Sequence, residues 1–285
     1  MVTPFGGDGS VDEQAFVRLV NGQIEAGVNF LIPCGTTGEA STLTEAEWLR
    51  VIELTVETAA GRVPVFAGCT HNSTVEAVAR AKKLAAVKGL TGILTANPYY
   101  NKPSQEGQYQ HFKAVAEATS LPVLLYNIPG RTGANLEPAT ALRLAEIKTV
   151  IGIKESSGSI NQITDLITQA PAGFRVFAGD DSLTLPVIAL GGYGVVSVAS
   201  NVIPGPMSKL VAAALKGDWE RARALNKQYF RLMQAHFWEP SPGPIKATMK
   251  MAGLLEENLR LPMTPVSEAT RERLKKLVAE VGLKQ

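Results

Sequence analysis

Thr149-Val-Ile-Gly-Ile-Lys154-Glu-Ser-Ser-Gly158 places a lysine directly after a short apolar run. Residues 149–153 are mostly β-branched and uncharged, which predicts a buried strand ending at Lys154, with a loop near Gly158. In general, a lysine amine held against apolar groups loses hydration of its charged form. Its pKa then falls below about 10.4, and the neutral amine becomes a nucleophile. Lys154 is therefore a candidate for Schiff-base chemistry on a carbonyl substrate, although a lysine at a strand end is more often a surface residue.

Short apolar runs of the same kind recur along the chain. Further strands are predicted at residues 28–33, 63–68, 92–95, 123–126, 175–179 and 194–198, and Met1–Thr3 would supply an eighth. The segments between them predict helices, with capping boxes at 10–13, 44–47 and 73–76 and further helices at 105–119, 137–147, 159–169, 182–190 and 206–216. Strict alternation of strand and helix implies parallel strands joined by right-handed crossovers.

This alternation predicts an α/β fold, and specifically a (β/α)8 TIM barrel over residues 1–217. Eight such units approach the usual barrel size of about 250 residues. A doubly wound open sheet is the alternative, although neither a Gly-rich dinucleotide fingerprint nor a glycine-lysine phosphate loop follows the first strands. Residues 218–285 predict helices at 218–236, 244–253 and 267–281, so we expect a C-terminal helical domain after the barrel.

The composition is that of an ordinary globular protein, with 45% hydrophobic and 19% charged residues and a formal net charge of +2. No basic stripe interleaves with aromatic residues, and no apolar run approaches the ~20 residues of a membrane span. The N-terminal residues lack the features of a signal peptide. Cys34 and Cys69 each end a predicted strand, which favours buried free thiols in a reducing cytosol. We expect a cytoplasmic protein that binds neither nucleic acid nor membranes.

Polar residues follow several predicted strands, and the carboxyl ends of barrel strands are where functional groups gather. Gly35-Thr36-Thr37-Gly38-Glu39 offers hydroxyl and N–H groups for a carboxylate, although a simple tight turn would use the same residues. Tyr126 ends a predicted strand, and we expect its side chain to point to the same face as that of Lys154. Arg131, in the Gly-rich loop that follows, can hold a carboxylate bidentately, although a surface arginine would look the same.

Two further pairs of residues stand at strand ends. Tyr99 and Tyr100 lie between prolines in a stiff loop, where a phenol could relay a proton or pack at an interface. Asp180 and Asp181 could bind a metal or cap a helix; no clustered histidines or further carboxylates complete a metal site, so capping is favoured. An amine, a phenol and carboxylate anchors suit carbon–carbon bond chemistry on an α-keto acid.

Four ordered motifs at these strand ends resemble those of the dihydrodipicolinate synthase family, within the pyruvate-dependent class I aldolases. The motifs are Gly35-Thr-Thr-Gly-Glu39, Tyr126-Asn-Ile-Pro-Gly-Arg131-Thr-Gly133, Gly152-Ile-Lys-Glu155 and Gly179-Asp-Asp181. The double threonine, the tyrosine pair and the arginine favour this family over the sugar-acid lyases. The resemblance implies a (β/α)8 barrel with a C-terminal helical domain, assembled as a homotetramer of two tight dimers.

The resemblance also implies a reaction without cofactor or metal. Pyruvate would condense with L-aspartate 4-semialdehyde to 4-hydroxy-tetrahydrodipicolinate, the first committed step of diaminopimelate and lysine biosynthesis. Lys154 would form the Schiff base, and Tyr126 would be the general acid and base. The other implied roles are a proton relay through Thr36 and Tyr100, pyruvate binding by Thr37 and Val196, and semialdehyde binding by Arg131. Tyr100 would reach into the site of the neighbouring subunit.

Many relatives carry a lysine feedback pocket at the dimer interface. The corresponding positions are Ala40, Ser41, Glu45, Trp48, Asn72, Glu76 and Tyr99. Asn72, Glu76 and Tyr99 match the family pattern, whereas Glu45 and Trp48 replace histidines of lysine-sensitive bacterial enzymes. We therefore expect weak or absent inhibition by lysine.

Two other functions are alternatives. A sibling pyruvate aldolase would cleave a keto sugar acid, but Arg131 would then have no matching carboxylate to bind. A non-catalytic barrel would serve as a binding or scaffold protein, but Lys154 and Tyr126 argue against that interpretation.

Overall fold

The computed structural model describes residues 1–283, which form two compact units. One unit is Phe66–Val196, and the other combines Met1–Val65 with the residues from Ser197 onward. Within the described residues, no helix has both the length and the apolar character needed to span a membrane. The predicted domain boundary between residues 217 and 218 stays a prediction.

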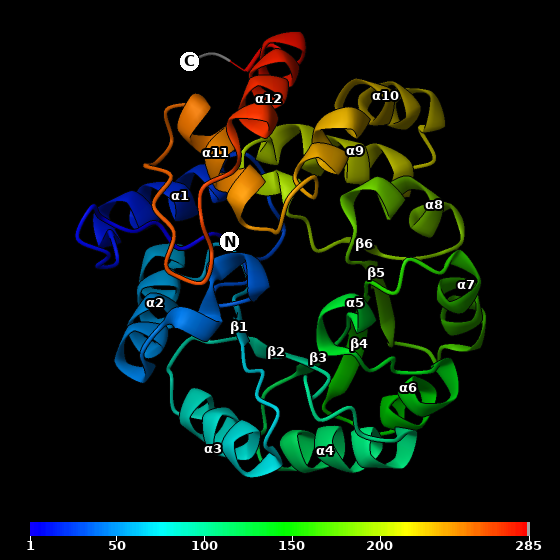
Figure 1. The fold of residues 1–285 in the computed structure, drawn as a ribbon. Helices are drawn as coiled ribbons and strands as arrows, with labels where there is room; N and C mark the ends of the chain where they lie inside the picture. The colour runs from blue at the N-terminus through cyan, green and yellow to red at the C-terminus, as the bar shows by residue number, and fades with distance from the viewer. Residues whose placement is uncertain (284–285) are drawn as a thin grey trace. The chain divides into compact units, whose positions relative to one another are not determined.

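The unit Phe66–Val196 contains a parallel sheet in which each strand pairs with the next in chain order (Figure 1). Its strands are β1 (Phe66–Gly68), β2 (Gly92–Ala96), β3 (Val123–Asn127), β4 (Val150–Glu155), β5 (Arg175–Ala178) and β6 (Gly194–Val195). Its helices are α3 (Thr74–Ala85), α4 (Gln105–Glu117), α5 (Pro129–Thr132), α6 (Pro138–Ala145), α7 (Ile160–Gln169) and α8 (Thr184–Ala189). The predicted α/β fold with alternating helices and parallel strands is confirmed.

The centre of this sheet is tightly packed. All residues of β2 and β3 are buried, as expected for parallel strands covered on both faces. Gly152 of β4 lies opposite Arg175 of β5, and a Cβ at this glycine would lie 2.3 Å from the Arg175 carbonyl oxygen. Only glycine therefore allows β4 and β5 to pair closely beside Lys154.

The strands predicted at Met1–Thr3 and 28–33 are not strands among the described residues. Leu31 instead forms an isolated parallel bridge with Val65. Continued pairing beyond Leu31 would need a backbone N–H at residue 33. This residue is Pro33, which has none, so the pairing does not extend. The parallel sheet of the described residues has six strands, and the eight-stranded barrel stays a prediction.

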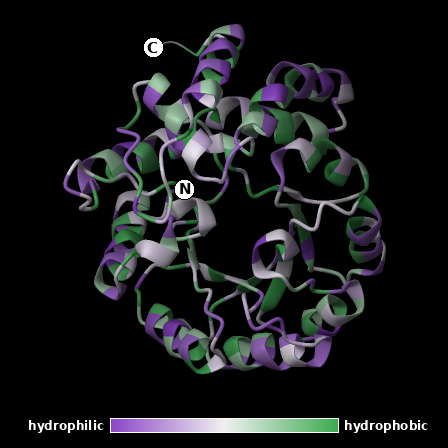
Figure 2. Cartoon of the chain, viewed as in Figure 1, coloured by the Kyte–Doolittle hydropathy of each residue, from purple (hydrophilic) through white to green (hydrophobic). Residues whose placement is uncertain are grey.

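The other compact unit is mainly helical. Its helices are α1 (Glu13–Glu25), α2 (Glu45–Ala59), α9 (Pro204–Leu215), α10 (Trp219–Ala235), α11 (Gly243–Met251) and α12 (Glu268–Glu280), with short 3-10 turns η1 (Thr36–Gly38), η2 (Ala40–Thr42) and η4 (Ala199–Asn201). Leu274 and Leu277 of α12 pack with Ala235 and Ala247 in a buried cluster. Figure 2 shows both purple and green segments along α12, as expected for a helix with one buried face.

Helix starts follow the predicted capping pattern in part. The box at Thr44–Glu47 is confirmed, with the Glu47 carboxylate accepting from the Thr44 N–H over 2.9 Å. The box predicted from Ser10 is wrong. Asp12 caps α1 instead, because its carboxylate stands next to the first helical residue and accepts from the N–H three positions on. Ser73 occupies the N-cap of α3 but makes no side-chain capping bond.

Candidate active site

Lys154 and Tyr126 lie side by side at the carboxyl ends of β4 and β3. They are partners in the parallel register, and Lys154 Nζ lies 3.9 Å from the centroid of the Tyr126 ring. Because side chains alternate along a strand, register partners point to the same face of the sheet. Lys154 is 8% exposed and Tyr126 is 5% exposed. The fold therefore brings the predicted amine and phenol together in a shielded place.

Gly179 allows the segment after β5 to approach Lys154. A Cβ at Gly179 would lie 1.7 Å from Ser156 Oγ and 3.1 Å from Lys154 Cε. Ser156 Oγ is buried and has no hydrogen-bond partner among the described residues. Val196, predicted to contact pyruvate, donates its N–H over 2.9 Å to the carbonyl of Ala178, the residue before Gly179. Ser156 and Gly179, from the ends of β4 and β5, thus lie beside the lysine, and sequence reasoning missed Ser156.

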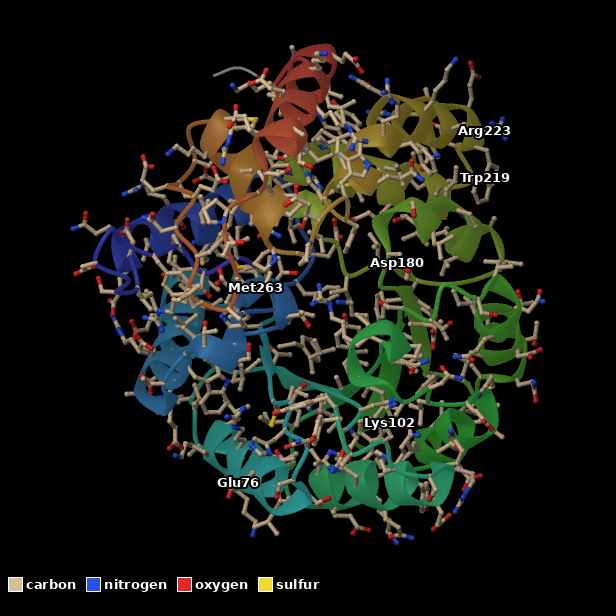
Figure 3. All side chains as sticks on the ribbon, in the orientation of Figure 1. Glu76, Lys102, Asp180, Trp219, Arg223 and Met263 are labelled. Atoms are coloured by element: carbon tan, nitrogen blue, oxygen red, sulfur yellow. The ribbon has the colours of Figure 1, made fainter. Side chains whose placement is uncertain are left out.

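Asp180 follows Gly179 at the same sheet edge (Figure 3). Burial raises the pKa of the Asp180 carboxyl, and the positive charge of Lys154 opposes this rise. Asp180 stands at the N-cap of the 3-10 turn Asp181–Leu183 without a side-chain capping bond, so the predicted cap does not form through Asp180. Among residues 1–283, no three His, Cys, Asp or Glu side chains cluster as a metal site would need. Asp180 is therefore best described as a second titratable group near the amine.

The opposite face of the same strands carries a buried polar network. Asn127 Nδ2 donates to Glu155 Oε2 over 3.0 Å, and the Ser157 N–H donates to Glu155 Oε1 over 2.6 Å. Burial raises the pKa of Glu155, whereas these hydrogen bonds oppose the rise. The Leu136 N–H donates to Asn127 Oδ1 over 2.9 Å, which ties the segment after α5 to the strands. Sequence reasoning missed this network, although the two-residue strand period places Asn127 and Glu155 opposite the amine and phenol.

Arg131 and Tyr100 come from neighbouring loops. Arg131 lies in α5, and the N–H of Tyr100 donates over 3.2 Å to the carbonyl of Thr132 in the same helix. Tyr100 has a φ of 75°, which is strained for a residue other than glycine and is found most often at functional sites. Its side chain is 88% exposed. The Tyr100 phenol is thus exposed to solvent, on a constrained backbone that is hydrogen-bonded to α5, the helix that contains Arg131.

Thr36 and Thr37 lie in η1, within the other compact unit. Thr36 is exposed and Thr37 is half-buried. Thr3 Oγ1 donates to the Gly38 carbonyl over 2.8 Å, and a Cβ at Gly38 would lie 3.0 Å from the Met1 carbonyl oxygen. The turn is therefore packed closely against the N-terminal residues. The part that its two hydroxyls play in the site stays a prediction.

Comparison with known proteins identifies the family. A family model described as the Dihydrodipicolinate synthetase family matches residues 1–281. The chain belongs to this family. It is 57% identical over 283 residues to the 4-hydroxy-tetrahydrodipicolinate synthase of Koribacter versatilis, covering 99% of this chain and 94% of that protein. The synthase of the same name from Acidobacterium capsulatum is also 57% identical, over 284 residues, with the same coverage.

Solved structures of the family agree in fold. The dihydrodipicolinate synthase of Thermotoga maritima superposes with a TM-score of 0.97 at 42% identity, covering 99% of this chain and 97% of that one. The enzyme of Aquifex aeolicus gives a TM-score of 0.96 at 40% identity, covering 99% and 96%. The similarity therefore extends over nearly the whole chain.

The positions predicted for the family's lysine pocket divide between the two units. In one unit, Asn101 Nδ2 donates to the Asn72 carbonyl over 3.0 Å, so the loop after Tyr99 meets the loop before α3. Glu76 is exposed in the first turn of α3 (Figure 3). The remaining positions lie in η2 and α2: Ala40, Ser41, Glu45 and Trp48. Trp48 is only 2% exposed, so its ring is part of the core.

Both cysteines are buried and neither forms a disulfide among the described residues, as predicted. Burial raises the pKa of the Cys69 thiol to about 12, which keeps it protonated and unreactive at neutral pH. The Cys69 thiol is therefore a poor nucleophile at neutral pH.

Proposed function

We propose that this chain is a lyase that condenses pyruvate with L-aspartate 4-semialdehyde to 4-hydroxy-tetrahydrodipicolinate, the first committed step of diaminopimelate and lysine biosynthesis. The contact between Lys154 Nζ and the Tyr126 ring carries this proposal. A shielded amine beside a phenol suits both Schiff-base formation and the proton transfers that accompany it. Membership of the dihydrodipicolinate synthetase family supports the same reaction.

The reaction begins when the Lys154 amine attacks the keto carbon of pyruvate and water leaves. The resulting iminium withdraws electrons from the methyl group, and Tyr126 takes one of its protons. The enamine carbon then attacks the aldehyde carbon of the second substrate, whose oxygen gains a proton. The amino group of the joined product attacks the imine carbon and expels Lys154 as a free amine. The protonated imine is the electron sink, so no cofactor is required.

The remaining residues bind the substrates and move protons. Thr36 and Tyr100 would relay protons to and from Tyr126, a contribution of roughly 10²–10⁴-fold for positioned acid–base groups. Thr37 and Val196 would bind pyruvate. Arg131 would receive the semialdehyde carboxylate, since a guanidinium binds a carboxylate through two parallel hydrogen bonds.

We also propose that residues 1–217 form a closed (β/α)8 barrel and that residues 218–285 form a helical domain after it. The consecutive parallel order of β1 to β6 supports the barrel. A cytoplasmic homotetramer of two tight dimers is the expected assembly, with the outward phenol of Tyr100 entering a neighbouring site. A similar solved chain is described as the first monomeric dihydrodipicolinate synthase variant, which supports oligomers as the usual state of these enzymes.

Lysine should inhibit this enzyme weakly or not at all. Glu45 and Trp48 replace histidines of the feedback pocket, and the Trp48 ring is in the core rather than available to a ligand. Steady-state rates measured with increasing lysine test this point. Strong inhibition at low lysine would show that the pocket works without the histidines.

The decisive experiment follows L-aspartate 4-semialdehyde with pyruvate present, for wild type beside Lys154→Ala. Wild type should consume the aldehyde, and Lys154→Ala should not. Lys82→Ala, at an exposed lysine of α3, is the matched control and should keep full activity. Borohydride reduction with pyruvate should label the Lys154 peptide of wild type.

Two outcomes would contradict the proposal. Labelling by pyruvate without consumption of the semialdehyde would indicate a sibling aldolase acting on another aldehyde. A folded wild type that is neither labelled nor active would favour the scaffold interpretation.

A further inference from the structure

A buried ion pair stands directly after the η1 turn. Lys246 Nζ lies 2.5 Å from Glu39 Oε1, and the two side chains are 0% and 1% exposed. Lys246 Nζ also donates to the Asn258 carbonyl over 2.8 Å and lies 4.3 Å from the centroid of the Phe5 ring. Burial lowers the pKa of Lys246, and the charge of Glu39 opposes this. Because burying two charges is costly, such a pair adds little net stability compared with apolar residues.

Glu39 has a backbone conformation that is uncommon for a residue other than glycine. Its φ is 53°, in the left-handed region that crowds a Cβ against the backbone. This residue joins η1 to η2: its N–H donates to the Thr36 carbonyl over 3.1 Å, and its carbonyl accepts from the Thr42 N–H over 3.0 Å. Glu39 is therefore part of the turn that carries Thr36 and Thr37, and its side chain connects that turn to Lys246.

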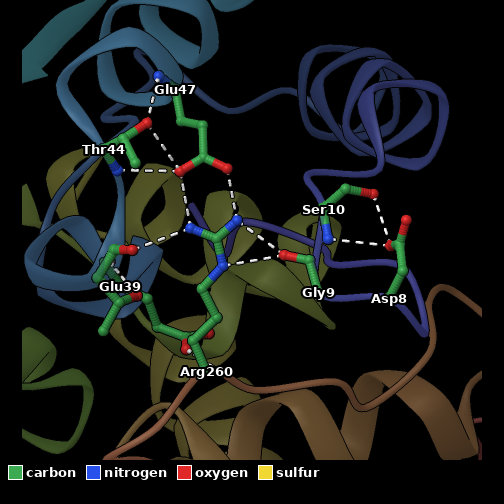
Figure 4. Close-up of polar contacts among 8 residues, drawn as sticks. Asp8, Gly9, Ser10, Glu39, Thr44, Glu47 and Arg260 are labelled. Carbon is green, nitrogen blue, oxygen red and sulfur yellow. Dashed lines mark hydrogen bonds and ion pairs between the residues drawn. The ribbon is translucent and has the colours of Figure 1, made fainter.

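Arg260 holds the second carboxylate oxygen of Glu39 (Figure 4). The backbone N–H of Arg260 donates to Glu39 Oε2 over 3.2 Å. The Arg260 guanidinium binds Glu47 through two nitrogens at 2.5 and 2.8 Å and donates to the Gly9 carbonyl. Its Cζ lies 4.4 Å from the centroid of the Phe5 ring. Both oxygens of Glu39 are thus fixed by one C-terminal segment, which runs from α11 to Arg260.

The surroundings of Lys246 also argue for a specific role. Its neighbours in α11 include Ile245, Ala247 and Met249, all of them 0% exposed. An apolar side chain at position 246 would suit this helix better than a charge. The lysine is therefore explained by the carboxylate that it holds and not by the packing of the helix.

We propose that Lys246 is a positioning residue, which sets the η1 turn through Glu39 so that Thr36 and Thr37 meet the substrate. This inference rests on the proposed roles of those two threonines. Loss of the ion pair should loosen the turn without touching Lys154 or Arg131. Binding of pyruvate and the proton relay should suffer, whereas binding of the semialdehyde should not.

The test compares steady-state constants of Lys246→Met and of the double variant Glu39→Gln/Lys246→Met with wild type. Lys246→Met leaves a buried carboxylate without its counter-charge and lowers stability, so the double variant, which removes both charges, keeps the measurement valid. We expect the KM for pyruvate to rise about tenfold and kcat to fall about tenfold in the double variant. The KM for the semialdehyde should stay within twofold, and borohydride with saturating pyruvate should still label Lys154.

Two further variants separate the possible results. Lys250→Met changes an exposed lysine of the same helix, paired with Glu256 at the surface, and should match wild type. Thr37→Val should raise the KM for pyruvate; if it does not, the role of Thr37 is wrong and the inference falls with it. If Thr37→Val raises the KM but the double variant has wild-type constants, the pair is only structural and the proposal is overturned.

Discussion

Replacing Gly179 by alanine should slow the reaction proposed at Lys154 while leaving the fold largely intact. The new Cβ would lie 1.7 Å from Ser156 Oγ, 3.0 Å from Ser156 Cβ and 3.1 Å from Lys154 Cε. Ser156 Oγ makes no hydrogen bond among the described residues, but it is buried and can move only by displacing the groups packed around it. The contacts with Ser156 Cβ and Lys154 Cε require the strand end and Lys154 to shift by a few tenths of an ångström as well.

The cost can be divided between stability and catalysis. Overpacking of a well-packed site costs roughly 1–3 kcal/mol, and an off-rotamer serine about 0.5–1.5 kcal/mol of that. A displacement near 1 Å at a reacting group can cost about 100-fold in rate. Because the shift here is smaller, we expect kcat of Gly179→Ala to fall roughly tenfold to hundredfold, with a fall in Tm of a few degrees.

The assay measures kcat, Tm and the rate of borohydride labelling by pyruvate for a double-mutant cycle. Ser156→Ala alone should stay within about twofold of wild type, because only an unpartnered hydroxyl is lost. The kcat of Ser156→Ala/Gly179→Ala should be about fivefold higher than that of Gly179→Ala, since the shortest contact is gone. Gly22→Ala is the control, since a Cβ at this α1 glycine meets nothing within 4 Å.

Two results would refute this reasoning. The first is a Gly179→Ala enzyme with more than half of the wild-type kcat and labelling rate. The second is a double variant no better than Gly179→Ala, which would mean that the Ser156 hydroxyl is not the obstacle.

Three further predictions concern stability. Burial lowers the pKa of His236 to about 3, so the folded state resists protonation and stability is lost as the pH falls from 6.5 towards 3. Between pH 7 and pH 5, the unfolding free energy of His236→Leu should therefore fall by about 2 kcal/mol less than that of wild type. Denaturant titrations at the two pH values measure this difference, and equal losses would contradict it. Arg260 lowers the pKa of Glu47 to about 2, so the stability from this pair is present above pH 4.5 and is lost as the pH falls towards 2. Glu47→Gln should therefore cost about 1–2 kcal/mol at pH 7, allowing for partial solvent screening, and a deficit that does not shrink by pH 3 would contradict the pairing. Gly152→Ala puts a Cβ 2.3 Å from the backbone oxygen of Arg175, so Tm should fall by roughly 6–12 °C. A fall under about 2 °C would show that β4 and β5 can move apart at little cost in free energy.

The candidate site was predictable where its geometry follows from the sheet. Tyr126 and Lys154 end neighbouring parallel strands, and such strands present their carboxyl ends at one edge, so their contact follows from strand periodicity. Ser156 and Glu155 follow from the same period but were not singled out, because neither residue type signals chemistry by itself. The sequence around Asp180 predicts a helix cap or a metal ligand and does not show its proximity to Lys154, because that proximity depends on how closely β5 approaches β4.

The sequence by itself determined the alternation of helices and parallel strands, the capping box at Thr44 and the position of Lys154 at a strand end, since periodicity, capping and motifs act between near neighbours in the chain. Only the tertiary structure decided that Leu31 pairs with Val65, because a bridge depends on which backbone groups folding brings together, although the missing N–H of Pro33 was visible in the sequence. It alone decided that Lys246 pairs with Glu39. The physical reason is that a buried charge is tolerated only where folding brings its counter-charge within hydrogen-bond distance, and no local pattern encodes a contact between residues so far apart in the chain.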